Sequence, residues 1–170
     1  MTANHDPADP EPLFELVRPD CWMGGVIFAS PHSGRDYPEW FLSESVLDPH
    51  VLRSSEDAFI DRLIAPAVAA GAVTLAARVP RCIVDLNRGA DELDPAVVQG
   101  AGPVTPDPLI RSGLGVIPRV VAQGRAIRRG KLTSAEAARR IDRFWRPYHA
   151  TLGPLIHNPQ VVADLEAKGA

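Results

Sequence analysis

The sequence predicts a single α/β domain, and three observations lead to this fold class. The first is a continuous apolar run at residues 26–29, which is typical of a strand covered on both faces of a sheet. The second is the order strand, helix, strand over 26–29, 56–70 and 72–76, in which the helix is long enough to connect two parallel strands. The third is an amphipathic helix after residue 133, whose apolar stripe fits the face of a sheet.

Length and composition describe an ordinary soluble globular protein. The 170 residues are enough for one domain with a sizeable core and too few to expect two. The net charge of −3 gives no reason to expect nucleic acid or an anionic membrane as a partner. No run approaches the roughly 20 apolar residues of a membrane-spanning helix, and the first twelve residues lack the pattern of a signal peptide. We therefore expect a cytoplasmic protein.

Three parts are expected along the chain. Residues 1–20 form an N-terminal arm, 21–157 the α/β domain, and 158–170 a C-terminal tail. Within the arm, the segment Phe14-Glu15-Leu16-Val17 can pair at a sheet edge. The two cysteines, Cys21 and Cys82, lie far apart in the sequence and each adjoins a predicted strand. We therefore expect buried thiols rather than a disulfide.

A histidine stands where the first strand ends. The apolar run at 26–29 is followed by the turn-forming segment Ser30-Pro31-His32-Ser33-Gly34. A buried strand that delivers a side chain to a loop is a common way to build a site, although a single histidine after a strand is more often a packed or surface residue. Residues 40–47 suggest a short helical or irregular segment that packs on the core.

The next helix is expected over residues 56–70. Ser54 and Ser55 are candidate N-caps, and the acidic residues that follow them suit the positive end of a helix dipole. Gly71 is a natural stop, and Pro66 should kink the helix. The strand at 72–76 comes directly after this helix.

Two further strands and a long loop follow. The apolar segment 82–86 is predicted as a strand, and 116–121 as another, in which Pro118 favours an edge position. Residues 89–115 lack periodicity and contain four prolines. They predict a long loop, which in a compact domain is usually either functional or disordered.

The clearest helix of the chain begins at Thr133. The spacing of Thr133 and Glu136 is that of a capping box, in which Thr133 caps the helix and Glu136 reaches back to it. Gly153-Pro154 is expected to end the helix. Its apolar residues recur at i+3 and i+4 and predict a stripe that packs on the sheet: Ala138, Ile141, Trp145, Tyr148 and Leu152.

Polar side chains that can carry chemistry stand at the ends of predicted elements. They form three sets: His32 after the first strand; Glu56 and Asp57 at the start of the kinked helix; and Arg78, Arg81, Asp85, Asn87 and Arg88 around the strand at 82–86. His32 and Asp57 offer zinc one nitrogen and one oxygen ligand. For Asp57 a capping or helix-dipole role remains an alternative.

The acid at position 85 needs a partner. In a strand covered on both faces Asp85 is costly unless it is paired, and Arg88 or Arg81 is an available partner. Asn87 offers an amide and Arg88 a planar guanidinium group with two parallel N–H donors, and both groups suit recognition of a carboxylate. A structural ion pair that closes the end of the sheet is equally compatible with these residues.

Six segments occur in one order along residues 25–157: ASPHSG (29–34), SEDAFID (55–61), RCIVDLNR (81–88), GLGVIPR (113–119), RGKL (129–132) and RPYH (146–149). Taken together they resemble the N-formylglutamate amidohydrolase family. The resemblance implies a three-layer α/β/α fold with a mostly parallel mixed sheet, like that of zinc carboxypeptidases. It also implies metal-dependent hydrolysis of the amide of an N-formyl or other N-acyl amino acid, such as N-formyl-L-glutamate, which gives formate and glutamate.

The resemblance further implies roles for individual residues. The implied zinc ligands are His32 and Asp57. The side chains that would bind carboxylate groups or polarise the scissile carbonyl are Arg81, Asn87, Arg88 and Arg119. Of these, Arg81 is assigned to catalysis and the other three to binding of the small-molecule substrate.

One part of the family pattern is missing from this chain. In the family, a later strand carries an Asp-x-His-Ser motif that supplies the third zinc ligand, and the general base comes from the same region. This chain has no such motif, and His149 and His157 lie in or just after the long helix. We therefore expect an incomplete zinc site. Three alternatives stay open: an active hydrolase, a non-catalytic module that binds carboxylates, and a fragment that needs a partner chain, including a second copy of itself.

Overall fold

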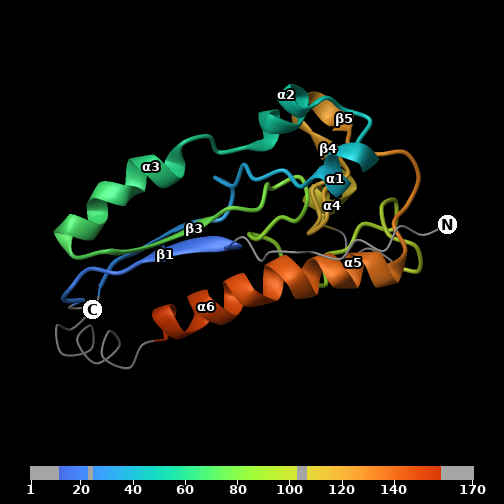
Figure 1. Ribbon diagram of the computed structural model, residues 1–170. Coiled ribbons are helices and arrows are strands. Elements are labelled where there is room, and N and C mark those ends of the chain that lie inside the picture. Colours follow the sequence, from blue (N-terminus) through green and yellow to red (C-terminus); the bar gives the residue numbers. More distant parts are fainter. Residues whose placement is uncertain (1–11, 23–24, 103–106, 158–170) are drawn as a thin grey trace.

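The computed structural model describes residues 12–22, 25–102 and 107–157. Its sheet has three strands in the order β1-β3-β2 (Figure 1). The central strand β3 (Val73–Ala77) pairs in parallel with β2 (Ile27–Ser30) and antiparallel with β1 (Phe14–Val17). The predictions of strands at 14–17, 26–29 and 72–76 are therefore confirmed to within one residue. The expected tail at 158–170 and most of the expected arm lie outside the described residues.

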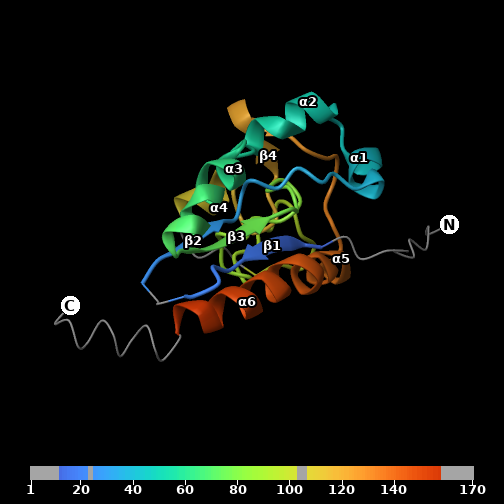
Figure 2. The same ribbon diagram turned by 60° about the vertical axis from the view of Figure 1, so that its left-hand side comes forward.

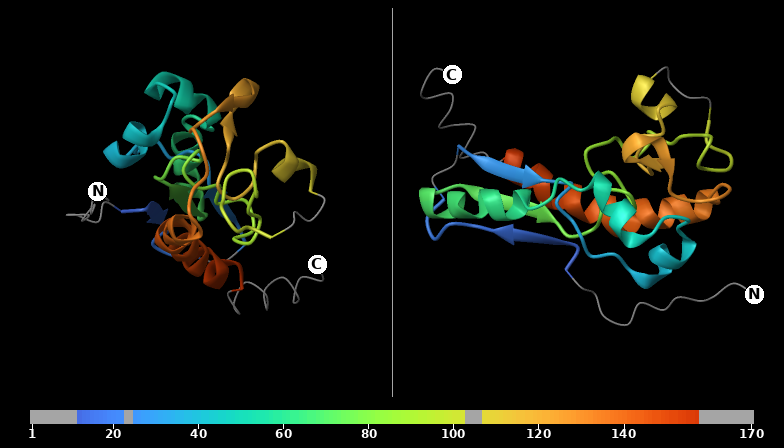
Figure 3. Two further views of the ribbon diagram at one scale, coloured as in Figure 1. Left: turned by 90° about the vertical axis from the view of Figure 1, so that its right-hand side faces the viewer. Right: turned by 90° about the horizontal axis from the view of Figure 1, so that it is seen from above.

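Helices pack on both sides of this sheet. Figures 1 and 2 show α6 (Arg146–Ile156) along one face and α3 (Ile60–Ile64) along the other. Figure 3 shows α3 lying above the strands when the molecule is seen from above. Within the described ranges, none of the helices combines the length and the apolar character that crossing a membrane requires.

The helix predicted over 56–70 is broken into shorter pieces. After α1 (Glu39–Glu44) and α2 (Pro49–Leu52), the chain forms η1 (Arg53–Ser55), then α3, then η2 (Ala65–Ala70). Ser54 and Ser55 are not N-caps, because their hydroxyls donate to the carbonyls of Val51 and Leu52 one turn earlier. The α-helix gives way to the 3-10 helix next to Pro66, whose ring lacks the N–H that an α-helix needs. Gly71, with a φ of +88°, ends the segment as expected.

The prediction of a strand at 82–86 is wrong. These residues are all buried, but they form turns, in which Ile83 N–H donates to the Pro80 carbonyl and Arg88 N–H donates to the Asp85 carbonyl. An apolar run reports burial, and burial in a tight turn leaves the same pattern as burial in a strand. The prediction at 116–121 is correct only for its end, where β4 (Val120–Val121) pairs with β5 (Arg125–Ala126). The short elements α4 (Pro108–Arg111) and η3 (Ala122–Gly124) complete this region.

The long C-terminal helix is confirmed, but it is not uniform. It runs from α5 (Ser134–Arg140) through a π-helical turn, η4 (Ile141–Trp145), into α6. Thr133 caps it, because its hydroxyl accepts the Glu136 N–H at 3.1 Å. The Glu136 carboxylate accepts from Arg140 one turn later, at 2.7 Å, instead of reaching back. The helix also continues past Gly153-Pro154 to Ile156, which corrects the expected end.

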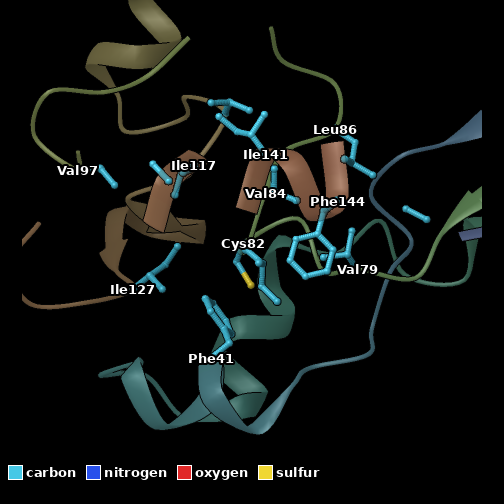
Figure 4. Close-up of a cluster of buried hydrophobic side chains, with 14 of the residues drawn as sticks. Phe41, Val79, Cys82, Val84, Leu86, Val97, Ile117, Ile127, Ile141 and Phe144 are labelled. Atoms are coloured by element: carbon cyan, nitrogen blue, oxygen red, sulfur yellow. The ribbon is translucent and has the colours of Figure 1, made fainter. Parts of the chain in front are cut away.

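The hydrophobic core lies between the long helix and the loops beyond the end of the sheet. Figure 4 shows side chains from the 82–86 turns, α1 and the π-helical turn meeting there. Phe41, Cys82 and Val84 are completely buried. Cys82 therefore matches the expectation of a buried thiol, whereas Cys21 is exposed and corrects it.

Candidate active site

His32 lies directly after the carboxyl end of β2, in a loop that packs closely on the chain after β3. The residue is 6% exposed. Its carbonyl accepts the Asp57 N–H at 3.0 Å. Two positions later, Gly34 lies so close to Val79 that a Cβ at Gly34 would come within 2.0 Å of the Val79 carbonyl oxygen. The lack of a side chain at Gly34 therefore allows the His32 loop to approach the segment that leads to Asp85.

The His32 ring lies between two carboxylates. Its Nε2 is 2.7 Å from Asp85 Oδ1, and its Nδ1 is 3.3 Å from Asp57 Oδ2. The two acids differ in environment, because the Asp85 side chain is 1% exposed and that of Asp57 is 53% exposed. Asp85 thus supports the ring from the interior, and Asp57 meets its other nitrogen at the solvent side.

Asp85 has a full set of donors. Besides the Nε2–H of His32, it accepts Arg81 Nε at 2.9 Å and the Asn87 N–H at 2.9 Å. Burial opposes ionisation, but the hydrogen bond and charge of His32 and the charge of Arg81 outweigh it and lower the pKa of the Asp85 carboxyl. Of the two arginines that were available partners, Arg81 pairs with Asp85.

The geometry around His32 suits a metal ligand. A carboxylate that holds one imidazole nitrogen fixes the ring and leaves the other nitrogen for a metal, an arrangement common around zinc. Here Asp85 holds Nε2, and Nδ1 faces an exposed carboxylate oxygen. The donor set of one nitrogen and one oxygen is one that zinc accepts. Among residues 12–22, 25–102 and 107–157, no group of three or more His, Cys, Asp or Glu side chains could hold a metal.

The later histidines have other partners. His149 Nε2 is 2.8 Å from the Leu86 carbonyl oxygen, and His157 Nδ1 is 2.9 Å from the Gly153 carbonyl oxygen. Each ring nitrogen therefore donates to a backbone carbonyl. Neither histidine joins His32 and Asp57 as a third ligand in the part of the chain that the structure describes.

The four expected substrate-contacting residues have different partners in the structure. Arg81 and Asn87 both contact Asp85. Arg88 is paired with Glu92 and Asp107, and its hydrogen bond lowers the pKa of the Asp107 carboxyl. Arg119 lies elsewhere: its Nε is 3.4 Å from Asp94 Oδ2, and its Nη2 donates to the Arg111 carbonyl at 3.1 Å. Arg81 and the Asn87 backbone thus contact the acid that holds His32, while Arg88 and Arg119 are held by other groups.

Sequence reasoning missed the bond between Asp85 and His32. Asp85 was expected to need a cationic partner, and an arginine was the nearest one in the sequence. The available signal was that a buried acid and a histidine each followed an apolar run. Side chains delivered from the ends of neighbouring buried segments often converge.

The comparisons with known proteins identify the family of this chain. Residues 24–164 match the family described as N-formylglutamate amidohydrolase. Among solved structures, the chain is similar to the crystal structure of N-formylglutamate amidohydrolase from Ralstonia eutropha JMP134, with 37% identity and a TM-score of 0.77. The match covers 92% of this chain and 54% of that one, so the chain spans about half the length of its solved relative. No curated protein matches the chain. Because the family match extends over most of its length, the chain belongs to the N-formylglutamate amidohydrolase family.

Proposed function

We propose that this chain carries part of a zinc-dependent active site that hydrolyses the amide of an N-formyl or other N-acyl amino acid. The proposed substrate is N-formyl-L-glutamate, and the products are formate and glutamate. One observation carries the proposal: the Nδ1 of His32 lies 3.3 Å from Asp57 Oδ2, while a buried carboxylate holds Nε2. We further propose that the fold around this site is a three-layer α/β/α fold with a mostly parallel sheet. The parallel pair of β2 and β3 supports this proposal.

His32 and Asp57 would hold the zinc ion. When bound, zinc lowers the pKa of a coordinated water and stabilises the oxyanion that forms on the amide carbonyl. Asp85 accepts the Nε2–H of His32, so the Nδ1 lone pair stays available for the ion. The described residues offer two of the three protein ligands of a typical catalytic zinc site, so a complete site needs another donor.

The arginines and Asn87 provide the groups that would recognise the substrate. Arg81 shares the Asp85 carboxylate with His32, which supports a role in polarising the scissile carbonyl. Asn87 and Arg88 would hold the α-carboxylate, and Arg119 would hold a second carboxylate. Arg88 is paired through Nε with Glu92 and through Nη2 with Asp107, so a substrate carboxylate would bind at Nη1 or replace one of these acids.

Zinc content and formate release test the proposal. The purified chain is loaded with zinc, dialysed, analysed for bound metal, and then incubated with N-formyl-L-glutamate while formate is measured. We expect bound zinc and formate release that a chelator abolishes and that His32→Ala and Asp57→Asn reduce at least 100-fold. His157→Gln is the matched control, because His157 is exposed and contacts a carbonyl of its own helix. A folded chain that binds no zinc and releases no formate contradicts the catalytic proposal.

A second candidate function, binding of carboxylates without catalysis, follows from the presence of only two zinc ligands among the described residues. With His32 and Asp57 alone, zinc binding is weaker, and a module that binds carboxylates through Asn87, Arg88 and Arg119 is the alternative. This module would bind an N-acyl amino acid with an affinity that survives a chelator and is lost in Arg88→Ala. Calorimetry with N-formyl-L-glutamate, with and without chelator, separates the two functions.

A further inference from the structure

Two rings on the long helix reach the segment that carries Asp85. Trp145 and His149 are one turn apart and stack, with ring centroids 3.9 Å apart and an interplanar angle of 23°. Trp145 Nε1–H donates to the Arg88 carbonyl at 2.8 Å, and His149 Nε2–H donates to the Leu86 carbonyl at 2.8 Å. One stacked pair therefore supplies the donors for two carbonyls that lie within three residues of Asp85.

The π-helical turn η4 ends at Trp145 and sets the direction of these rings. A π-helical turn takes more residues than an α-helical turn, so it rotates the side chains that follow relative to those that precede it. Phe144 and Tyr148 remain buried in the core, while their neighbours Trp145 and His149 are half-buried and face the 86–88 segment. Such turns are rare and occur frequently at functional sites.

The 85–88 segment is held from several directions. The Asp85 N–H donates to the Val116 carbonyl at 2.8 Å, and the Asn87 N–H donates back to the Asp85 carboxylate. The segment forms turns, so the ladder of a sheet does not hold it. The bonds from Trp145 and His149 therefore restrict how Asp85 can move, and Asp85 in turn holds Nε2 of His32.

We propose that Trp145 and His149 are positioning residues, which hold the 86–88 segment so that Asp85 orients His32 toward Asp57. Their link to zinc rests on the proposed function, whereas their effect on His32 does not. A purely structural role in helix packing would lower stability and leave the His32–Asp85 bond intact. The two roles therefore differ in what happens to the His32 ring.

Substitution by phenylalanine removes each donor and keeps an aromatic ring for stacking. Trp145→Phe, His149→Phe and the double variant are compared with the wild type in two measurements. The first is the proton resonance of His32 Nε2–H in the zinc-free protein, assigned by its loss in His32→Gln. The second is the Kd of zinc, measured by competition with a coloured chelator. In the double variant we expect the resonance to broaden through solvent exchange and the Kd for zinc to rise roughly tenfold.

Two further variants separate positioning from stability. Leu155 is buried near the end of α6, so Leu155→Ala leaves a cavity and lowers Tm. We expect this variant to leave the His32 resonance and the zinc Kd unchanged. His149→Gln keeps an N–H donor. Compared with His149→Phe, it should therefore show a sharper His32 resonance and a zinc Kd closer to that of the wild type. If the single and double Phe variants lower Tm but keep a sharp His32 resonance, the proposal is wrong. If the wild type binds no zinc, the proposed function fails, and the resonance alone still decides the positioning role.

Discussion

A buried carboxylate governs the site at the scale of single residues. Asp85 is completely buried and accepts hydrogen bonds from His32, Arg81 and the Asn87 backbone. Removing one partner of a buried ion pair leaves an uncompensated charge and costs about 3–5 kcal/mol. Each partner of Asp85 therefore contributes to folding as well as to the geometry of the site.

The two cysteines make a residue-scale prediction. Burial raises the pKa of Cys82 to about 11, whereas Cys21 is exposed. Because the thiolate is the reactive form, Cys82 stays protonated and unreactive at pH 8. Iodoacetamide at pH 8 should label Cys21 within minutes and leave Cys82 unlabelled until denaturant unfolds the protein. Peptide mapping by mass spectrometry checks this, and rapid labelling of Cys82 in the folded chain would contradict it.

The candidate residues of the site could be predicted, but their contacts could not. His32 and Asp57 became candidates because a histidine and an acid stood at the ends of predicted elements, and the family resemblance assigned them as ligands. The contact between His32 and Asp85 joins positions that are 53 residues apart, and no local spacing encodes it. The pairing of Arg88 with Glu92 and Asp107 could not be predicted either, because both acids lie in the long loop at 89–115, which has no periodic pattern.

At the scale of elements, close backbone contacts place the site. The strands of the sheet were predictable because unbroken apolar runs and the turn residues between them are local signals. The turns at 82–86 were not predictable, because their sequence is as apolar as that of a buried strand. The π-helical turn was also missed, since Ile141, Trp145 and Tyr148 fit ordinary helical spacing. The turns at 82–86 also depend on contact with a distant segment, because the Asp85 N–H donates to the Val116 carbonyl. A second such contact, between Gly34 and Val79, places the His32 loop.

Gly34→Ala tests this contact. The new Cβ would meet the Val79 carbonyl within 2.0 Å, so the His32 loop must move away from the segment beyond β3. We expect the free energy of unfolding to fall by about 1–3 kcal/mol, as in other overpacked sites. Chemical denaturation followed by circular dichroism measures the change.

Gly102→Ala is the matched control. A Cβ at Gly102 would meet nothing within 4 Å, and the residue has no positive φ, so its stability should change by less than about 0.5 kcal/mol. Equal stabilities of the two variants would show that the loop relaxes without cost and would contradict the role given to Gly34.

At the scale of the whole molecule, both edges of the three-stranded sheet lack a further strand among the described residues, and the edge at β2 is the more apolar. Within the described residues β2 pairs only with β3, in parallel, and parallel strands are usually covered on both faces. Val26 and Phe28 are 51% and 40% exposed beside this edge, and Leu63 of the neighbouring α3 is 74% exposed. Exposed apolar strands at a sheet edge favour association with other chains. The solved relative contains nearly as much chain again as the shared part.

We therefore expect the chain to associate through this edge when it is alone in solution. Light scattering should show a mass that rises above that of one chain as concentration increases. Phe28→Lys should shift the protein toward the monomer, because a charge on an edge strand opposes pairing. Leu109→Lys, which changes a residue of similar exposure on α4 (47% against 40% for Phe28), should not. A wild-type chain that remains monomeric at every concentration would contradict the prediction.

The shared bonds of Asp85 also affect how this site changes in evolution. A lineage that lost the proposed hydrolysis would still be selected to fold, and the buried Asp85 carboxylate is stable only with its partners, the charged Arg81 and the Nε2–H donor of His32. Asp57 is different, because it is half exposed and its loss leaves no buried charge without a partner. His32 and Asp85 would therefore persist in inactive descendants, while Asp57 would drift. Under the proposed function, the acid at position 57, more than the histidine it faces, should distinguish the family members that bind zinc.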